Sequence, residues 1–334
     1  MPNIKISCLP PLSGNPSMST IFPIVVSGVT QKVTLSAITT SVLAQSQPQT
    51  TLVTSGNTAN STVRINNSNT SSDGGTALGF GNIAISGYST VSGGYCNTAS
   101  NVYATIAGGR QNTASCYSSV IGGGASNTSS GYYSIVGGGY TNTASGNYSV
   151  VVGGNQNIVN GSYSFIGSGQ VNCVTGSYSS IAGGECNNIQ SQYSTIPGGH
   201  SNIILSGDYN TISGGYCNIN NGTLSVIGGG ECNLITGGTS SFIGSGRFNN
   251  INGNCSVIVG GNINIIESAY SFIAGGCKNT AMHDNVFILG RGIESDRECT
   301  TYVNNLTIKN IPTSSVGLSS GSVWSNGGRL SIIP

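Results

Sequence analysis

Few side chains in this 334-residue chain could carry acid–base, nucleophilic or metal chemistry, and they are scattered. There are nine Asp and Glu residues, two His and ten Cys. Cleavage of a glycosidic bond needs two carboxyl groups about 5 to 9.5 Å apart. Glu185 and Glu231 occupy the same position of a repeated sequence, but the three intervening repeat lengths separate them by on the order of 14 Å in stacked strands. A neighbouring subunit could bring a closer carboxylate, so a polysaccharide-cleaving enzyme stays as an alternative.

The His and Cys residues show no metal-binding pattern. No two Cys form a C-x-x-C pair and no His lies at ligand spacing, which disfavours a zinc site. No nucleophile or carboxylate recurs near His200 or His283, so we expect both to be exposed turn residues. Ten Cys are too sparse for the disulfide framework of a small secreted domain, so we expect free thiols. The sequence therefore predicts no catalytic residue, no cofactor and no metal ligand.

Composition narrows the function classes further. Gly accounts for 52 residues, only 6% of residues are charged, and the net charge is +1. A typical globular domain has about 25% charged residues. The balanced charge gives no reason to expect binding to nucleic acid or to an anionic membrane. No apolar run approaches the roughly 18 residues of a membrane span, and residues 1–11 lack the apolar region of a secretory signal.

A repeat of 14 to 16 residues dominates the sequence. Its fourteen copies begin at Tyr88, Tyr103, Tyr117, Tyr133, Tyr148, Tyr163, Tyr178, Tyr193, Tyr209, Leu224, Ser240, Cys255, Tyr270 and Asn285. The fourth position is Val or Ile in every copy, and a Gly-rich corner follows it. An Asn then recurs in thirteen copies, at Asn97, Asn112, Asn127, Asn142, Asn157, Asn172, Asn187, Asn202, Asn218, Asn233, Asn249, Asn264 and Asn279.

This pattern predicts one coil of a β-solenoid per repeat. Side chains two apart share one face of a strand, so positions two and four point inward from a first strand. The Asn and the apolar residue two positions later point inward from a second strand. Glycine permits the tight corner between the strands. Stacked coils place identical residues about 4.8 Å apart, so the Asn side chains are expected to form a hydrogen-bonded ladder.

A coil this narrow buries little apolar surface against the entropy cost of ordering its backbone. We therefore expect lateral association, most simply as a parallel homotrimer, which would bury a second face of each coil. Ten of the fourteen copies begin with Tyr. A stripe of Tyr that stacks on carbohydrate is one reading, and a structural Tyr ladder in the trimer interface is the one we favour.

The residue after the Gly corner varies most, which is incompatible with a tightly stacked interior. We expect these side chains to project outward as a receptor-facing surface, here called the corner stripe. The alternative is that they only keep a nearly uncharged protein soluble. The corner stripe comprises Tyr95, Arg110, Tyr140, Asn155, Gln170, Glu185, His200, Tyr216, Glu231, Arg247 and Asn262.

The repeat unit resembles that of the left-handed parallel β-roll in the heads of YadA-like trimeric adhesins. Tyr178-Ser-Ser-Ile-Ala-Gly and Asn285-Val-Phe-Ile-Leu-Gly match the first half of that family's NSVAIGxxSxAxG unit. The doubled Gly and the later Asn depart from it and lengthen the coil. The resemblance implies an all-β fold, a β-solenoid that is a left-handed parallel β-roll of about fourteen 15-residue coils, in a parallel homotrimer.

The two ends resemble fibre proteins of phages and environmental viruses. The matching segments are Ile6-Ser-Cys-Leu-Pro with residues 22–36, then residues 300–311 and 317–333. Residues 22–43 alternate like strands around Ser27-Gly28, and Asn326-Gly327 predicts a second hairpin.

The predicted organisation has four parts, with small β segments at both ends. Residues 1–45 are an anchor or assembly segment, and residues 46–86 are a Ser/Thr/Asn/Gly-rich linker or irregular coils. Residues 87–293 are the β-roll, and residues 294–334 are a C-terminal β cap.

The resemblances and the repeat together predict a structural virion fibre or decoration protein that contributes to host attachment. Its localisation would be the virion surface. Its partners would be itself, other virion proteins through the N-terminal segment, and a host surface glycan or protein, with no nucleic acid and no membrane insertion. The alternatives are a cellular trimeric surface adhesin, which would need a secretion signal, a coiled-coil stalk and a membrane barrel, or an extracellular filament subunit.

Overall fold

The computed structural model describes residues 21–26, 29–34, 63–65, 69–71, 74–307, 311–326 and 329–332. These residues form strands, bridges and turns. Within this described part, no helix is long and apolar enough to cross a membrane. The chain divides into two compact units, residues 1–133 and 134–334, called here the N-terminal unit and the C-terminal unit.

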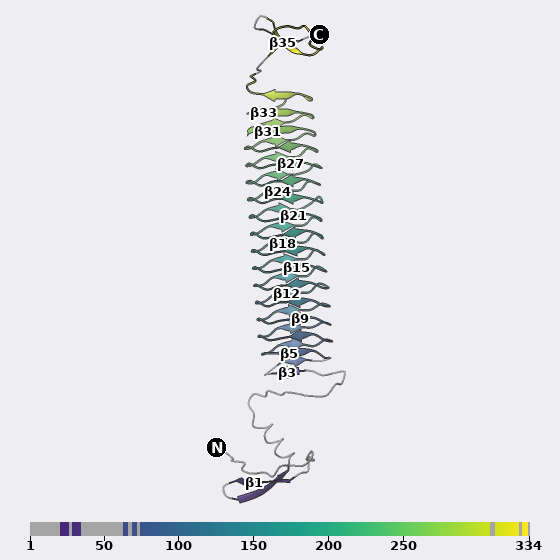
Figure 1. Ribbon diagram of the computed structural model, residues 1–334, viewed down its shortest axis with the longest axis vertical. Helices are drawn as coiled ribbons and strands as arrows, with labels where there is room; N and C mark the ends of the chain where they lie inside the picture. The colour runs from purple at the N-terminus through teal and green to yellow at the C-terminus, as the bar shows by residue number, and fades with distance from the viewer. Residues whose placement is uncertain are drawn as a thin grey trace. The chain divides into compact units, whose positions relative to one another are not determined.

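Two parallel sheets form the coils of the N-terminal unit (Figure 1). Its first sheet contains β3 (Val63–Ile65), β5 (Thr76–Leu78), β7 (Thr90–Val91), β9 (Thr105–Ile106) and β11 (Val120–Ile121). Its second sheet contains β4 (Thr70–Ser71), β6 (Ile83–Ala84), β8 (Thr98–Ala99), β10 (Thr113–Ala114) and β12 (Thr128–Ser129).

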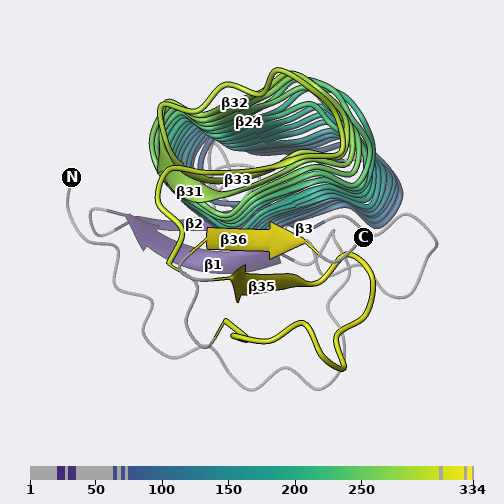
Figure 2. The same cartoon turned by 90° about the horizontal axis from the view of Figure 1, so that it is seen from above.

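The C-terminal unit repeats this arrangement. Its first sheet contains β13 (Ile135–Val136), β15 (Val150–Val151), β17 (Phe165–Ile166), β19 (Ser180–Ile181), β21 (Thr195–Ile196), β23 (Thr211–Ile212), β25 (Val226–Ile227), β27 (Phe242–Ile243), β29 (Val257–Ile258), β31 (Phe272–Cys277), β33 (Phe287–Arg291) and β34 (Thr301–Val303). Its second sheet contains β14 (Thr143–Ala144), β16 (Ile158–Val159), β18 (Cys173–Val174), β20 (Asn188–Ile189), β22 (Ile203–Ile204), β24 (Ile219–Asn220), β26 (Leu234–Ile235), β28 (Asn250–Ile251), β30 (Ile265–Ile266) and β32 (Thr280–Ala281). Figure 2 shows the two sheets on opposite sides of the coil, with β24 and β32 facing β31 and β33.

Consecutive coils pair in register, one repeat apart. Ile166 pairs with Ile181, and Ile181 pairs with Ile196, all in parallel strands. The predicted fold, an all-β solenoid of stacked parallel coils, is therefore confirmed. Its left-handedness and its trimeric state stay predictions.

The core consists of columns of identical or similar side chains. Ile181 from the first sheet and Ile189 from the second are fully buried, as are the equivalent Val, Ile and Ala residues of the other coils. Asn220 replaces the apolar residue in one coil and is also fully buried. Its Nδ2 donates to the Ser225 carbonyl oxygen at 2.9 Å, so this inward polar group is satisfied.

One predicted repeat boundary is wrong by one residue. The copy assigned to begin at Tyr117 places Val120 inward, whereas Ile121 is the buried residue and pairs with Ile106. Ser118 has the positive φ that Tyr103 has in the preceding coil. The coil therefore begins at Ser118, and Gly122 then holds the position of Ala107 in the preceding coil.

Parallel pairing extends beyond the residues that the repeat pattern marked. β4 and β6, within residues 46–86, pair in parallel with each other, and β6 pairs with β8. At the other end, β34 pairs in parallel with β33.

Both predicted hairpins are confirmed. β1 (Ile21–Val26) pairs antiparallel with β2 (Val29–Thr34), and β35 (Val323–Asn326) pairs antiparallel with β36 (Arg329–Ile332). The rest of the predicted segment 1–45, including Ile6-Ser-Cys-Leu-Pro, lies outside the described residues.

Candidate functional site

The corner stripe forms a third column of paired backbone between the two sheets. Consecutive members are joined by single parallel bridges, from Tyr95 to Arg110 in the N-terminal unit and from Tyr140 to Asn262 in the C-terminal unit. All eleven residues are exposed or half-buried.

Three further residues belong to this column, and the sequence analysis missed them. The bridges include Phe80 before Tyr95, Ala125 after Arg110, and Cys277 after Asn262. Phe80 lies in a coil that precedes the first Tyr start, and Ala125 was hidden by the wrong boundary at Tyr117. A glycine or a Gly pair before each of them was the available signal.

The glycine before each stripe residue is required by geometry, as Gly184 shows. Its φ is +90°, and a Cβ built there would lie 2.2 Å from the Gly199 carbonyl oxygen and 2.6 Å from Asn187 Nδ2. A residue with a side chain would both adopt a strained backbone and push the next coil away. Glycine thus allows adjacent coils to approach closely beneath the stripe.

The Asn ladder lies just behind this corner and fixes it. Asn187 Nδ2 donates to the carbonyl oxygens of Gly183 at 3.3 Å and Gly199 at 2.9 Å, and Asn187 Oδ1 accepts the Asn202 backbone N–H at 3.0 Å. All thirteen Asn residues are fully buried. Because each side chain bonds to the coil before or after its own, the stripe stands on a rigid backbone.

Charged and aromatic side chains contact each other along the stripe. Glu231 Oε2 lies 3.2 Å from Arg247 Nε, and Glu185 Oε2 lies 3.8 Å from His200 Nε2. The His200 ring stacks on Tyr216 with 5.3 Å between ring centroids. The expectation that no carboxylate lies near His200 was therefore wrong, because neighbours in a solenoid are one coil apart rather than adjacent in sequence.

Glu185, Cys186 and His200 form a compact cluster of different donor types. One ligand atom from each, a carboxylate oxygen, the thiol sulfur and a ring nitrogen, lies within 4.8 Å of the others. Cys186 has a φ of +56°, and both it and Glu185 are exposed. The left-handed residue interrupts the usual alternation of a strand, so two consecutive side chains reach the same surface.

Thiols recur in the column that contains Cys186. Cys96, Cys217 and Cys232 hold the same repeat position with φ between 51° and 56°, and all four are free thiols in the structure. Cys217 and Cys232 lie in consecutive coils. Burial raises the pKa of the Cys232 thiol, and a hydrogen bond with Cys217 raises it further.

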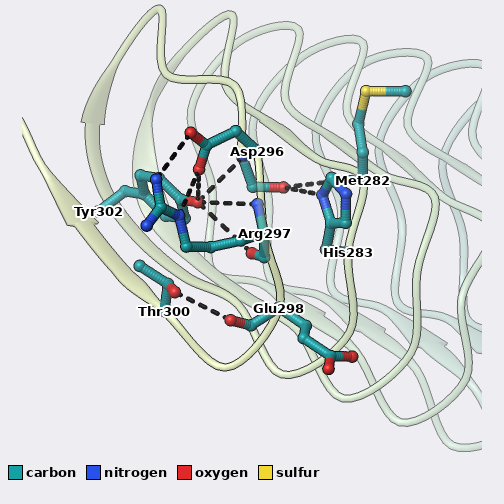
Figure 3. A network of polar contacts seen from close by, with 8 residues as sticks. Met282, His283, Asp296, Arg297, Glu298, Thr300 and Tyr302 are labelled. Atoms are coloured by element: carbon teal, nitrogen blue, oxygen red, sulfur yellow. Dashed lines mark hydrogen bonds and ion pairs between the residues drawn. The ribbon is translucent and has the colours of Figure 1, made fainter.

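A second polar network lies in the loop between β33 and β34 (Figure 3). Arg297 donates from Nε to Asp296 Oδ1 at 2.9 Å and from a second guanidinium nitrogen to Oδ2 at 3.1 Å. The Tyr302 hydroxyl donates to Asp296 Oδ1 at 2.6 Å. Hydrogen bonds from Arg297 and Tyr302 hold the pKa of the Asp296 carboxyl well below its usual range.

This network stabilises the loop rather than preparing a reactive group. The backbone N–H groups of Asp296 and Arg297 both donate to the Tyr302 hydroxyl, at 3.0 and 3.2 Å. Ser295 is buried and accepts the Met282 backbone N–H at 2.9 Å, and its Oγ lies 3.3 Å from His283 Nδ1. The loop is thereby tied to the last coils, and His283 takes part in that attachment.

The exposed tyrosines at repeat position one form a second surface column. Tyr148, Tyr163, Tyr178, Tyr193 and Tyr209 stack in sequence with ring centroids 4.8 to 5.0 Å apart. Each has a positive φ, and each ring is about half exposed. These Tyr side chains therefore form a stacked ladder within a single chain.

The comparison with known proteins does not identify a family for this chain. No protein-family model matches the chain, and no curated protein sequence matches it either.

Proposed function

We propose that this chain is a structural fibre protein of a virus particle, assembled as a parallel homotrimer, whose corner stripe contributes to host attachment. The solenoid serves as the shaft, and the terminal segments serve for assembly. The single observation that carries the proposal is an exposed apolar face on the C-terminal unit.

That face is the outer surface of the first sheet. Val152 and Leu289 each expose 54% of their surface and Val259 exposes 47%, and Phe242 and Phe287 on the same face are also exposed. Large exposed apolar side chains that recur on one face of a protein mark a place of association. Pairing these faces between copies would bury side chains that a single solenoid leaves in water.

The thinness of each coil supports the same conclusion. The coil that begins at Tyr178 buries Ile181 and Ile189 as its large apolar residues, and its buried polar residues are Ser179, Asn187 and Ser191. At about 25 cal/mol per Å² of buried apolar surface, two such side chains offset little of the backbone entropy of fifteen ordered residues. Lateral burial adds the missing stabilisation.

The virion location rests on the resemblance of the terminal segments to viral fibre proteins. The attachment role rests on the corner stripe, which presents Tyr, Arg and Glu side chains on a backbone fixed by the Asn ladder. Varied exposed residues on a rigid scaffold suit recognition, and Tyr and Arg are enriched at binding hot spots.

The polysaccharide-cleaving alternative gains no support from its two candidate carboxylates. Glu185 faces His200 and Glu231 faces Arg247, so each lies against a different residue of the following coil. A glycosidase would direct both groups to one bond.

Light scattering coupled to size exclusion tests the assembly. The wild-type chain should elute at three times the chain mass, and the triple variant Val152→Ser, Val259→Ser, Leu289→Ser should dissociate. The control Gln190→Ser, Thr236→Ser changes exposed residues beside the second sheet and should remain trimeric. A stable, folded wild-type monomer at micromolar concentration would contradict the proposal.

Host-cell binding tests the attachment role separately. Replacing Tyr95, Tyr140 and Tyr216 together by Ser should reduce binding while leaving the trimer intact. Unchanged binding by a correctly assembled variant would leave the corner stripe as solvated surface and move recognition to the terminal segments.

A further inference from the structure

We propose that Glu185, Cys186 and His200 bind one Zn²⁺ ion at the corner between two adjacent coils. Their ligand atoms lie within 4.8 Å of one another. Thiolate sulfur, imidazole nitrogen and carboxylate oxygen are the three donor types that proteins offer to zinc. Three protein ligands leave the fourth tetrahedral position for water, as is usual at an open zinc site.

The ligand atoms must move closer together to hold the ion. With Zn–N and Zn–O bonds of about 2.0–2.1 Å, two ligand atoms of a tetrahedral site lie about 3.3 Å apart. His200 Nε2 and Glu185 Oε2 are 3.8 Å apart, too far for a hydrogen bond between them. Their side chains are 46% and 52% exposed, so rotation of the glutamate closes the gap without disturbing the core.

The backbone under the cluster is fixed, which reduces the entropy cost of binding. Glu185 and His200 are partners in a parallel bridge. The Glu185 backbone N–H donates to Gly199 at 3.0 Å, and the Ser201 N–H donates back to Glu185 at 2.9 Å. The left-handed conformation of Cys186 then turns its thiol to the surface beside Glu185.

The imidazole is positioned by packing rather than by a hydrogen bond. His200 Nδ1 is buried and has no hydrogen-bond partner among the described residues, while the ring stacks on Tyr216. A proton on Nδ1 leaves the lone pair of Nε2 directed toward Glu185. A thiolate and a carboxylate together balance the charge of the ion.

The chain contains a matched site that lacks one ligand. Glu231-Cys232 repeats Glu185-Cys186 within the same Gly-Gly-Glu-Cys-Asn sequence. The residue bridged to Glu231 in the next coil is Arg247 instead of His, and its guanidinium forms an ion pair with Glu231 at 3.2 Å. A guanidinium cannot donate a lone pair to a metal, so this site should not bind zinc.

Substitutions that exchange His and Arg between the two sites test whether the third ligand decides zinc binding. Calorimetric titration of the reduced full-length protein with ZnCl₂ should give one ion per chain. His200→Arg and Cys186→Ser should abolish that binding, and Arg247→His should raise the stoichiometry to two. Glu185→Gln should weaken affinity by at least the 10- to 100-fold typical of losing a partner around a metal ligand. Titration with Co²⁺ should give a thiolate absorption band that Cys186→Ser removes.

Alkylation of the wild-type protein provides a readout that does not depend on any variant folding. Zn²⁺ should protect Cys186 from iodoacetamide, as located by peptide mass analysis, and leave Cys232 as reactive as before. Equal protection of both thiols, protection of neither, or a stoichiometry that His200→Arg leaves unchanged would overturn the proposal. Loss of binding in Cys217→Ser but not in Cys186→Ser would also overturn it, because the ion would then lie between Cys217 and Cys232.

Discussion

Asn187 Oδ1 accepts the backbone N–H of Asn202, which occupies the same position one coil later, at 3.0 Å. The same contact recurs between Asn172 and Asn187 at 3.0 Å. Each Asn therefore satisfies a backbone group of the following coil while its own N–H is satisfied by the coil before. Stacking is specified by a chain of buried polar contacts as well as by apolar burial.

Asn187→Ala should destabilise the C-terminal unit by about 1–3 kcal/mol, because it leaves the Asn202 N–H without a partner in a buried place and removes one of the two donors to the Gly199 carbonyl. Urea unfolding and local hydrogen exchange measure the loss. The adjacent Asn188→Ala is the control. Asn188 is half-buried, and its Oδ1 is shielded from solvent without a hydrogen-bond partner among the described residues. Removing that oxygen breaks no hydrogen bond, so the change should stay within about 0.5 kcal/mol. Equal losses in both variants would show that the ladder contributes nothing specific.

The sequence predicted those parts of the fold that repeat. The columns that contain Ile181 and Asn187 follow from period-2 alternation and a 15-residue repeat, because stacking demands the same shape at the same place. The predicted coil start at Tyr117 is wrong because a Tyr does not by itself mark the start of a coil. The start follows from the position of the buried residue, which is Ile121 in this coil. The coil that contains Phe80 was missed for the same reason, since it has no initial Tyr.

Contacts between unlike residues were beyond the repeat pattern. His200 meets Glu185 and Cys186 because consecutive coils stack. Glu185 and His200 hold the same repeat position, but their side chains differ, and the repeat pattern does not show which unlike side chains will meet there. The bond from Tyr302 back to Asp296 depends on the shape of one loop that occurs once. Because this loop occurs once, the sequence offers no repeated pattern from which its side-chain contacts could be predicted.

Gly154→Ala should prevent proper stacking, whereas Gly153→Ala should be tolerated. Gly154 has a φ of +95°, and a Cβ there would lie 2.2 Å from the Gly169 carbonyl oxygen. Backbone strain and overpacking each cost about 1–3 kcal/mol. A Cβ at Gly153 would meet nothing within 4 Å. Thermal unfolding of the two variants measures the difference, and similar melting temperatures would contradict the close approach of these coils.

Cys217 and Cys232 should remain reduced in air-exposed protein. Stacked residues lie about 4.8 Å apart, which is within the Cα range of a disulfide. Burial raises the pKa of the Cys232 thiol, however, and a smaller thiolate fraction slows oxidation. The intact mass measured without reductant should therefore equal that of the fully reduced chain. A Cys217–Cys232 bridge in most molecules would refute this prediction.

Acidification should release the loop between β33 and β34 before it disturbs the coils. The folded-state pKa of Asp296 is lowered by hydrogen bonds from Arg297 and Tyr302, so its carboxylate stabilises the folded loop at pH values above the unfolded Asp pKa of about 3.9. That contribution is lost progressively as the pH falls below this value toward the lower folded pKa. Exchange of the Asp296 and Arg297 amide hydrogens, corrected for intrinsic rates, should lose protection in that window.

Asp296→Asn should remove the pH dependence of this protection and give a loosened loop at neutral pH as well. Glu298→Gln is the matched control in the same loop, because Glu298 accepts the Thr300 hydroxyl through its backbone carbonyl at 2.9 Å and not through its carboxylate (Figure 3). Its pH profile should therefore follow the wild type. If Glu298→Gln abolished the acid transition and Asp296→Asn preserved it, the carboxylate that holds this loop would have been assigned to the wrong residue.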